Sequence, residues 1–202
     1  MQKKILLVAV LAVVAVAAFR FSSSADDKLP SLVTNAPAPV FVAKDFKGKS
    51  FDLAANLGKI IVLEWTNPDC PFVKRVYRDG LMNDLQKRWT EKGVVWKTVN
   101  STYHTTPEQN EKFAEEHALP GAILDDRGGE LGRLYGARTT PHIFIINQQG
   151  ALAYQGALDS DSYGDQGLER VAYVDLALKA LSSGSAVQLA SAKPYGCSVK
   201  YR

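Results

Sequence analysis

The sequence predicts an α/β protein in which helices flank a central mixed β-sheet. Three features predict it: short apolar runs rich in β-branched residues, amphipathic helical patterns between them, and a hairpin pattern late in the chain. Alternating strand and helix patterns are typical of a sheet covered by helices, and the late hairpin makes the sheet mixed. A length of 202 residues, with 46% hydrophobic and 22% charged residues, suits one soluble domain with accessory segments.

The first 25 residues are expected to direct export rather than to join the domain. Lys3 and Lys4 precede an apolar run at residues 5–19, which Arg20 ends. A charged start before such a run is typical of a signal peptide, and the run is short for a membrane-spanning helix. An uncleaved membrane anchor at residues 5–19 is the alternative. Both interpretations place the rest of the chain outside the cytoplasm, as a periplasmic or secreted protein.

The charge balance gives no support to nucleic-acid binding. The chain has 24 basic and 21 acidic residues, and three of the bases lie in the first 25 residues, which contain no acid. The exported part is therefore electrically balanced, whereas nucleic-acid-binding proteins carry clustered basic residues. We expect no nucleic-acid partner, and contact with a membrane only through the N-terminal segment.

The first elements follow in order from residue 26. Residues 26–35 mix charged residues, Ser and Pro and are expected to form a linker into a domain at residues 36–183. The domain opens with a hairpin whose turn lies at Lys47–Gly48. The run at residues 59–65 is apolar and rich in β-branched residues, which predicts a buried central strand.

A helix is expected to begin at Pro71, because the missing N–H of proline would have no partner at the first helical position. Gly80 is expected to interrupt it before residues 81–89 continue. Thr106 and Gln109 form a capping-box pattern for a later helix. The remaining expected elements are a strand at 93–99, a helix at 107–119, a strand at 122–125, a helix at 129–135, a hairpin at 142–154, a helix at 168–181, and a tail at 184–202.

Three of these features together resemble the thioredoxin-like superfamily. They are the strand at residues 59–65, Cys70 just before the following helix, and Thr140–Pro141 just before the strand at residues 142–147. Within the superfamily the arrangement is most similar to the redoxin branch, which contains the alkyl hydroperoxide reductase/thiol-specific antioxidant proteins. The resemblance covers the predicted domain and implies a thioredoxin-like sandwich with thiol-based chemistry.

Cys70 is the candidate nucleophile. A thiolate at the start of a helix meets unpaired backbone N–H groups and the positive end of the helix dipole, which lower the thiol pKa. Lys74 and Arg75 are expected to add to this effect and Asp69 to oppose it. A sulfur that reacts in this way is expected to be open to solvent. The alternative is an inert buried cysteine, or half of a passive disulfide.

The resemblance implies that Thr140–Pro141 is a cis-proline loop, which lies against the reactive cysteine and shapes the approach of substrates. From the residues alone, a Pro after Thr is also simply a good start for a strand. Among thioredoxins the reactive cysteine belongs to Cys-x-x-Cys, but here Val73 takes the second position. Cys70 therefore has no local disulfide partner.

The chain also departs from the peroxiredoxin pattern Pro-x-x-x-Thr/Ser-x-x-Cys. Leu63 and Asn67 stand where Pro and Thr/Ser would be, so the hydroxyl that helps to activate peroxide is replaced by an amide or must come from Thr66. Arg138 is the candidate for a cation beside the thiolate, with a solvated loop charge as the alternative. Asn67 and Arg138 join the cis-proline loop as candidate substrate-binding residues.

The chain has two cysteines, so Cys70 and Cys197 can form one intramolecular disulfide in an oxidising compartment. Cys197 is interpreted as a resolving cysteine, because Gly184, Pro194 and Gly196 give the tail a flexible composition. The alternative is a static bridge that stabilises the fold. The histidines are scattered along the chain and no second thiol lies near Cys70 in sequence, so no metal or cofactor is expected.

The leading hypothesis is an exported thiol-based oxidoreductase. Cys70 would attack a disulfide-containing protein or a peroxide, Cys197 would resolve the product, and a thiol reductant would restore both thiols. The competing hypothesis is a non-catalytic redoxin-fold binding or structural module with a permanent Cys70–Cys197 disulfide.

Overall fold

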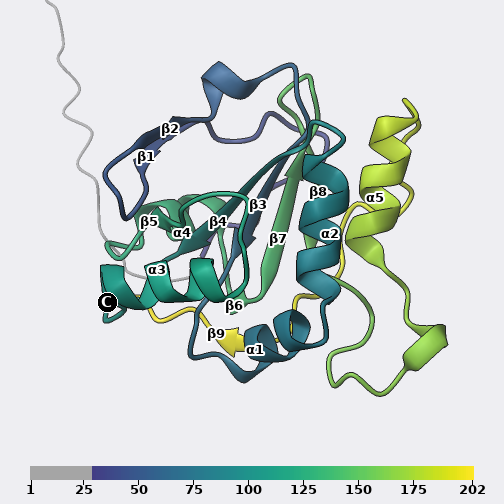
Figure 1. Ribbon diagram of the computed structural model, residues 1–202. Coiled ribbons are helices and arrows are strands. Elements are labelled where there is room, and N and C mark those ends of the chain that lie inside the picture. The colour runs from purple at the N-terminus through teal and green to yellow at the C-terminus, as the bar shows by residue number, and fades with distance from the viewer. Residues whose placement is uncertain (1–28) are drawn as a thin grey trace, which may run out of the picture.

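The computed structural model describes residues 29–202 (Figure 1). The expected export segment at residues 1–25 lies outside the described residues, as does the start of the expected linker. Within residues 29–202, none of the helices combines the length and the apolar character needed to cross a bilayer.

A mixed five-stranded sheet forms the centre of the molecule and confirms the predicted fold class. Its strand order is β5-β4-β3-β7-β8, in which β3, β4 and β5 run parallel. Strand β7 runs antiparallel to β3, and β8 antiparallel to β7. The strands are β3 (Ile61–Trp65), β4 (Val95–Asn100), β5 (Leu124–Asp125), β7 (His142–Ile146) and β8 (Leu152–Gly156).

Helices cover both faces of this sheet (Figure 1). Side chains from α1, α2, α3 and α5 pack into the core cluster on one face. Side chains from α4 and from the hairpin β1–β2 pack into the cluster on the other. These elements are α1 (Pro71–Arg78), α2 (Leu81–Thr90), α3 (Pro107–Glu116), α4 (Glu130–Tyr135), α5 (Tyr173–Ser182), β1 (Val42–Lys44), β2 (Ser50–Asp52) and the 3-10 turns η1 (Ala54–Asn56) and η2 (Gly167–Glu169).

Strand β3 is buried along its whole length because layers cover both of its sides. Ile61, Leu63 and Trp65 belong to the cluster on the α4 side, and Val62 belongs to the cluster on the α1 side. This two-sided burial explains why the sequence shows a continuous apolar run here rather than an alternating one.

The predicted helix boundaries hold at two informative places. Gly80 adopts φ +73°, a left-handed conformation that ends the first helical segment and lets α2 begin at the next residue. Thr106 and Gln109 form the full capping box at the start of α3, with the Thr106 hydroxyl accepting from the Gln109 backbone N–H.

The last helix begins five residues later than its pattern predicts, at Tyr173 instead of Leu168. The residues before it are held by the loop at 159–160. The Arg170 Nη1 donates to Asp159 Oδ2 at 3.0 Å, and the Val171 backbone N–H donates to the Ser160 hydroxyl at 2.9 Å. These contacts keep the chain out of the helix until α5 starts.

The tail is packed against the domain, so the expectation of a flexible tail is wrong. A short strand, β9 (Cys197–Ser198), pairs antiparallel with β6 (Thr139–Thr140), and Thr140 lies opposite Cys197. Farther on, Val199 is buried in the core cluster on the α4 side. The Tyr201 hydroxyl donates to the Ala137 carbonyl at 2.7 Å.

Candidate active site

Cys70 occupies the N-cap position of α1, immediately before Pro71, with extended backbone angles. Asn67 folds the loop that delivers it there. The Asn67 side-chain oxygen accepts from the Asp69 backbone N–H at 2.9 Å, and the Asn67 carbonyl accepts from the Cys70 N–H at 3.0 Å. An Asn whose side chain bonds two residues onward is a common way to close a tight turn. Asn67 therefore positions the cysteine between the end of β3 and the start of α1.

The sulfur is not open to solvent, which corrects the sequence expectation. Cys70 is only 1% exposed and belongs to the core cluster on the α1 side. The reason is the tail: Cys197 packs against the same cluster, and Figure 1 shows β9 beside the start of α1. Cys70 thus lies at a helix N-terminus, as predicted. It is also covered by the tail around Cys197, which the sequence pattern predicts to be flexible.

The loop before β7 lies against this sulfur. The Cys70 Sγ–H donates to the Thr140 carbonyl at 3.0 Å, and the Thr140–Pro141 peptide bond is cis, as the resemblance implied. Thr140 is itself buried, and within residues 29–202 its hydroxyl has no partner beside the neutral thiol, so it is available to donate a hydrogen bond to a thiolate at this sulfur. Two segments 70 positions apart in the chain therefore meet at one sulfur atom.

Both cysteines are free thiols, and the fold brings them together. Burial raises the pKa of Cys70, but the Thr140 and Cys197 side chains and the backbone amides of Val73 and Cys197 stabilise its thiolate and bring the pKa below its ordinary value. Burial and the neighbouring Cys70 raise the pKa of Cys197 to about 11, against a small opposing effect of Lys200. Cys70 is therefore the thiol that ionises first, while Cys197 keeps its proton.

The cations next to Cys70 in sequence do not turn toward it. Arg75 Nη2 donates to the carbonyls of Asp161 and Ser162 at 2.7 and 3.3 Å, in the loop between β8 and η2. Lys74 is exposed. The lowered pKa of Cys70 thus comes from hydrogen-bonding groups at the helix start and the tail, rather than from the two cations that the sequence suggested.

Arg138 is not among the groups that shift the pKa of Cys70. Its side chain is exposed, and with His142 and Gln155 it lines a small cavity of about 90 Å³. The His142 Nδ1 accepts from the Arg138 backbone N–H at 3.2 Å, and the imidazole ring contacts Phe144 on the α4 side of the sheet. Burial, and to a smaller degree the Arg138 charge, lowers the pKa of His142 to about 3, so this histidine is neutral.

Glu64 is a buried acid that the sequence interpretation passed over. It is fully buried in β3 and accepts from the Tyr77 hydroxyl at 2.7 Å, Gln86 Nε2 at 2.8 Å and Trp96 Nε1 at 2.9 Å. Burial raises its pKa, and these hydrogen bonds oppose the rise. A single acid inside the apolar run at residues 59–65 was the available signal, because a buried carboxyl requires dedicated partners.

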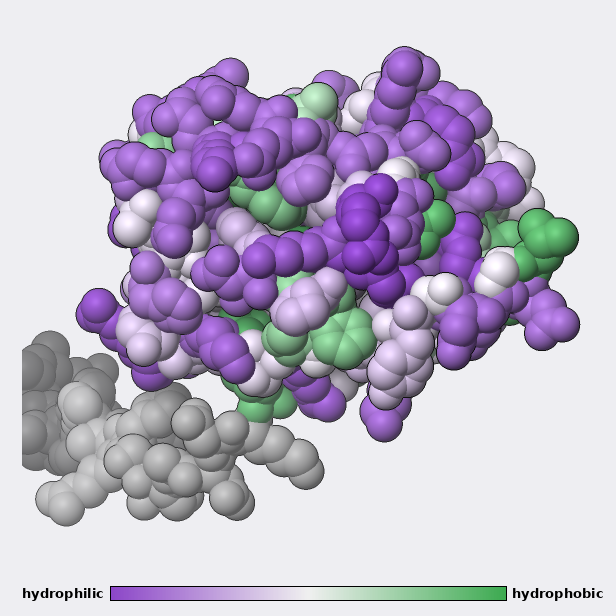
Figure 2. Space-filling model, turned by 60° about the horizontal axis from the view of Figure 1, so that its bottom comes forward, coloured by the Kyte–Doolittle hydropathy of each residue, from purple (hydrophilic) through white to green (hydrophobic). Residues whose placement is uncertain are grey.

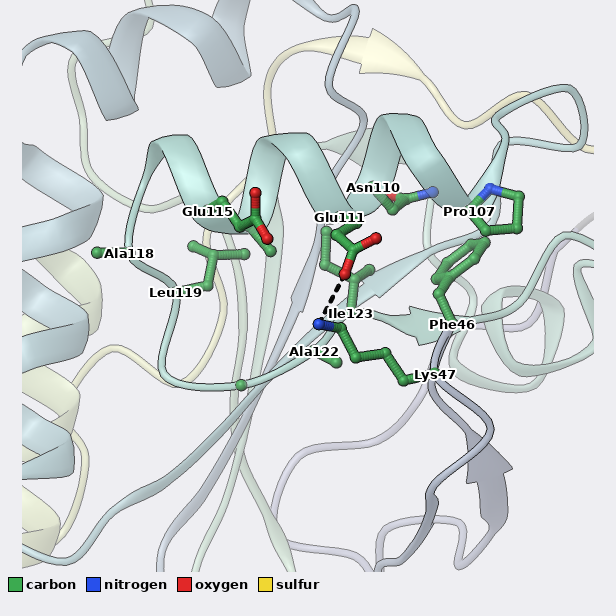
Figure 3. A pocket seen from close by; sticks show the side chains of 12 residues that line it. Phe46, Lys47, Pro107, Asn110, Glu111, Glu115, Ala118, Leu119, Ala122 and Ile123 are labelled. Atoms are coloured by element: carbon green, nitrogen blue, oxygen red, sulfur yellow. Dashed lines mark ion pairs between the residues drawn. The ribbon is translucent and has the colours of Figure 1, made fainter.

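Two surface pockets lie near α3. One, of about 430 Å³, adjoins the Cys70 loop and is lined by Pro68, Asp69, Lys74 and five residues of the α3 segment: Gln109, Lys112, Phe113, Glu116 and His117. The other, of about 400 Å³, lies between α3 and the β1–β2 turn (Figure 3). Lys47 and Glu111 form an ion pair of 2.8 Å at that second pocket, and none of the predicted site residues lines it.

The chain resembles known thiol-disulfide oxidoreductases. It is 30% identical over 114 residues to thiol-disulfide oxidoreductase ResA of Bacillus thuringiensis subsp. konkukian (strain 97-27). The match covers 56% of this chain and only 63% of the length of that relative. Sporulation thiol-disulfide oxidoreductase A of Bacillus subtilis (strain 168) is 26% identical over 156 residues. That match covers 75% of this chain and 88% of the relative.

The fold has a close solved counterpart. The crystal structure of an uncharacterized conserved protein from Geobacillus kaustophilus superposes with a TM-score of 0.73 at 28% identity, over 84% of this chain and 93% of that one. The sequence model of the AhpC/TSA family matches residues 34–155. That range contains the central strand, Cys70 and the cis-proline loop, and it ends before Cys197. The chain belongs to the AhpC/TSA family.

Proposed function

We propose that the chain is an exported thiol-disulfide oxidoreductase in which Cys70 attacks and Cys197 resolves. The observation that carries this proposal is the pairing of two thiols, distant in sequence, whose pKa values are displaced in opposite directions. A low-pKa thiol beside a protonated second thiol is the arrangement that a two-step exchange requires. The names of the two curated relatives support the same chemistry.

In the first step, the Cys70 thiolate attacks one sulfur of a substrate disulfide. A Cys70–substrate bond forms, the substrate S–S bond breaks, and the second substrate sulfur leaves as a thiolate. In the second step, Cys197 attacks the Cys70 sulfur while its proton passes to the departing thiolate. The substrate leaves as a dithiol, its first-released thiolate taking a proton from water, and the chain holds a Cys70–Cys197 disulfide. A thiol reductant then supplies the two electrons that restore both thiols.

The remaining site residues receive supporting roles in this proposal. Thr140 and Pro141 orient the sulfur through the Thr140 carbonyl, and Asn67 shapes the loop that carries it. Arg138 is proposed as a contact for the substrate rather than for the sulfur, since its side chain is exposed. The pocket beside Pro68, Asp69 and Lys74 offers a neighbouring surface of mixed charge to a disulfide-containing protein.

Peroxide reduction has weaker support than disulfide exchange. The Asn67 side-chain oxygen is engaged by the Asp69 N–H, and Arg138 lines a cavity with His142 on the α4 side of the sheet. Thr66 is the remaining candidate for an activating hydroxyl, because its buried Oγ1 has no hydrogen-bond partner within residues 29–202. Peroxide is therefore included as a second substrate in the test below.

A permanent structural bridge is the second candidate function, and the burial of Cys70 is the observation that favours it. One experiment separates the two. The full chain is offered a protein disulfide and hydrogen peroxide in parallel, with a thiol reductant as electron source. We expect turnover of the disulfide, its loss in Cys70→Ser, and a trapped mixed disulfide on a non-reducing gel with Cys197→Ser. Undiminished turnover in Cys70→Ser, or a Cys70–Cys197 bond that reductants cannot open, would exclude the redox function.

Export is proposed from the charged start and apolar run of residues 1–25. A fusion of residues 1–35 to a reporter enzyme that folds only outside the cytoplasm should be active. The mass of the isolated protein then distinguishes a cleaved signal peptide from an anchor retained through residues 5–19. A reporter that stays inactive with the intact leader would rule out export by this segment.

A further inference from the structure

The residues around Cys197 cross directly over the Cys70 site, and we call residues 195–199 the strap. Strand β9 of the strap pairs with β6, where Thr140 lies opposite Cys197. The Thr140 carbonyl also accepts the hydrogen bond from Cys70. One short edge of backbone therefore holds both cysteines, and the strap narrows the approach to the Cys70 sulfur, which is only 1% exposed.

The strap is fixed at its first residue by Tyr195. The Tyr195 hydroxyl donates to Asp159 Oδ1 at 2.7 Å, and its ring lies 6.2 Å from the ring of Phe72 on α1. Asp159 is fully buried and is held in turn by Arg170 Nη1 at 3.0 Å. A hydrogen bond to a buried, ion-paired carboxylate is stronger than a neutral one. This end of the strap is therefore tied to both α1 and the loop before α5.

The strap is fixed at its other end by backbone and core contacts. The Val199 N–H donates to the Arg138 carbonyl at 3.0 Å, and the Val199 side chain is buried in the core cluster on the α4 side. Cys197 is thus held between two anchored residues.

Figure 2 shows the face of the molecule that carries α1 and β9. This face is mainly hydrophilic, with small hydrophobic patches near its middle.

Gly196 allows the strap to lie this close to β6. Its φ is +125°, and a Cβ built there would stand 2.1 Å from the Thr140 carbonyl oxygen, a backbone atom. A side chain at residue 196 would therefore push the strap away from the cis-proline loop rather than displace a flexible neighbour. Glycine also tolerates this backbone conformation at no steric cost.

We infer that the strap is the specificity-determining element of the site: it holds Cys197 against Cys70, admits small reagents, and excludes macromolecular ones until it leaves β6. Tyr195 and Gly196 are its positioning residues. The inference rests on the proposed function, since the strap controls access to the proposed nucleophile. A protein substrate that approached in an extended conformation would need the β6 backbone groups that the strap already uses.

The test measures the labelling of Cys70 in the reduced full chain, by peptide mass spectrometry, with iodoacetamide and with a bulky polyethylene-glycol maleimide. In the unmodified protein, the bulky reagent should react far more slowly relative to iodoacetamide than it does with a free thiol. Gly196→Ala should raise the bulky-reagent rate at Cys70 by roughly tenfold or more. Tyr195→Phe, which keeps the ring and removes the bond to Asp159, should raise it by roughly tenfold or more, the factor for one hydrogen bond to a charged group.

Gly184→Ala is the matched control. Gly184 lies in the same tail with φ +72°, but a Cβ there would meet nothing within 4 Å, so the variant shares the backbone strain without the clash. Its labelling should equal that of the unmodified protein. A positioning role also predicts that the Cys70 pKa rises in Gly196→Ala, since the groups that Cys197 supplies move away. A general loss of structure would instead accelerate both reagents.

Equal labelling by both reagents in the unmodified protein would overturn the inference. So would unchanged bulky-reagent rates in both strap variants. If Gly196→Ala does not fold, Tyr195→Phe alone decides. These outcomes are independent of the redox assay, because alkylation needs only an accessible thiol. If the chain turns over disulfides but both reagents label Cys70 equally well, the proposed function stands and the inference about the strap is wrong.

Discussion

Cys70 combines a buried sulfur with a lowered pKa, and the two properties have separate causes. Burial alone would favour the neutral thiol and make the residue inert. The Thr140 and Cys197 side chains and the backbone amides of Val73 and Cys197 more than offset this effect, because each presents a hydrogen-bond donor to the thiolate. The site thus stabilises the thiolate with fixed local hydrogen-bonding groups. Salt weakens such buried interactions much less than it weakens the attraction of an exposed cation.

The Thr140 hydroxyl provides a first test of this account. Thr140→Val keeps the shape of the side chain and removes the donor, so the pKa of Cys70 should rise. The rate of alkylation by iodoacetamide at pH 7 should fall about fivefold, the factor for a hydrogen bond of about 1 kcal/mol. Thr140→Ser keeps the hydroxyl and should behave like the unmodified chain. An identical pH–rate profile in Thr140→Val would assign the effect to the Cys197 side chain and the backbone amides.

Glu64 gives the fold a pH dependence of predictable sign. Its pKa in the folded chain is raised by burial, against its hydrogen bonds, so its contribution to stability is complete below the unfolded value of about 4.3 and is lost as pH rises through the folded pKa. The free energy of unfolding should therefore fall by up to about 1.4 kcal/mol per pH unit in that window.

Urea unfolding of the unmodified chain and Glu64→Gln between pH 5 and 8 measures this effect. The variant is expected to lose the part of the slope that belongs to Glu64, whatever its absolute stability. Asp126, whose pKa burial also raises, is present in both proteins and cancels from the difference. Parallel stability curves for the two proteins would mean that Glu64 does not titrate in this range.

At the scale of elements, α3 depends on its N-terminal cap. Thr106 is exposed, so its role lies in the hydrogen bond from the Gln109 N–H and in the reciprocal bond from its own N–H to Gln109 Oε1 at 2.8 Å. Thr106→Ala should lower the free energy of unfolding by about 1 kcal/mol without changing the urea m-value. Thr106→Ser should restore most of it. If Thr106→Ser is as unstable as Thr106→Ala, the stabilising group is the Thr106 methyl group rather than its hydroxyl.

The elements that sequence predicted well are those whose cause is local. The capping box at Thr106, the break at Gly80 and the continuous apolar run of β3 each depend on neighbouring residues. The start of α5 was missed because Arg170 and Val171 are held by a loop 11 positions earlier. Such a contact overrides helical periodicity and leaves no local pattern.

The same distinction applies to the site. Cys70 at a helix N-terminus was predicted from the loop that Pro71 ends, and the cis-proline loop was implied by the family resemblance. The closeness of Cys197 to Cys70 was open, since it depends on β9 pairing with β6 across most of the domain. The burial of the sulfur follows from that pairing and was predicted wrongly. Arg138 was proposed beside the thiolate, and only its backbone takes part in holding the strap.

At the scale of the whole molecule, the Cys70–Cys197 bond would close a loop of about 127 residues. In the chain-entropy model such a cross-link stabilises the folded state by roughly 5 kcal/mol. The reduced protein, however, has a stabilising contribution of its own. The pKa of Cys70 is lowered in the folded chain, so this contribution is present above the unfolded thiol value of about 8.5 and is lost as pH falls through the folded pKa.

The stability difference between the oxidised and reduced chains should therefore shrink as pH rises from 6 toward about 7.5. Over this range Cys197 adds no slope, because its raised pKa of about 11 keeps it protonated in the folded chain and it is still largely protonated when unfolded. Urea midpoints of the oxidised and reduced chains at several pH values measure this difference. Cys197→Ser cannot form the bond, so its midpoints under oxidising and reducing conditions should be the same. A difference that stays constant with pH would describe a static bridge. A shrinking one describes a bond that becomes easier to reduce as Cys70 ionises, which is the property that a cycling redox pair requires.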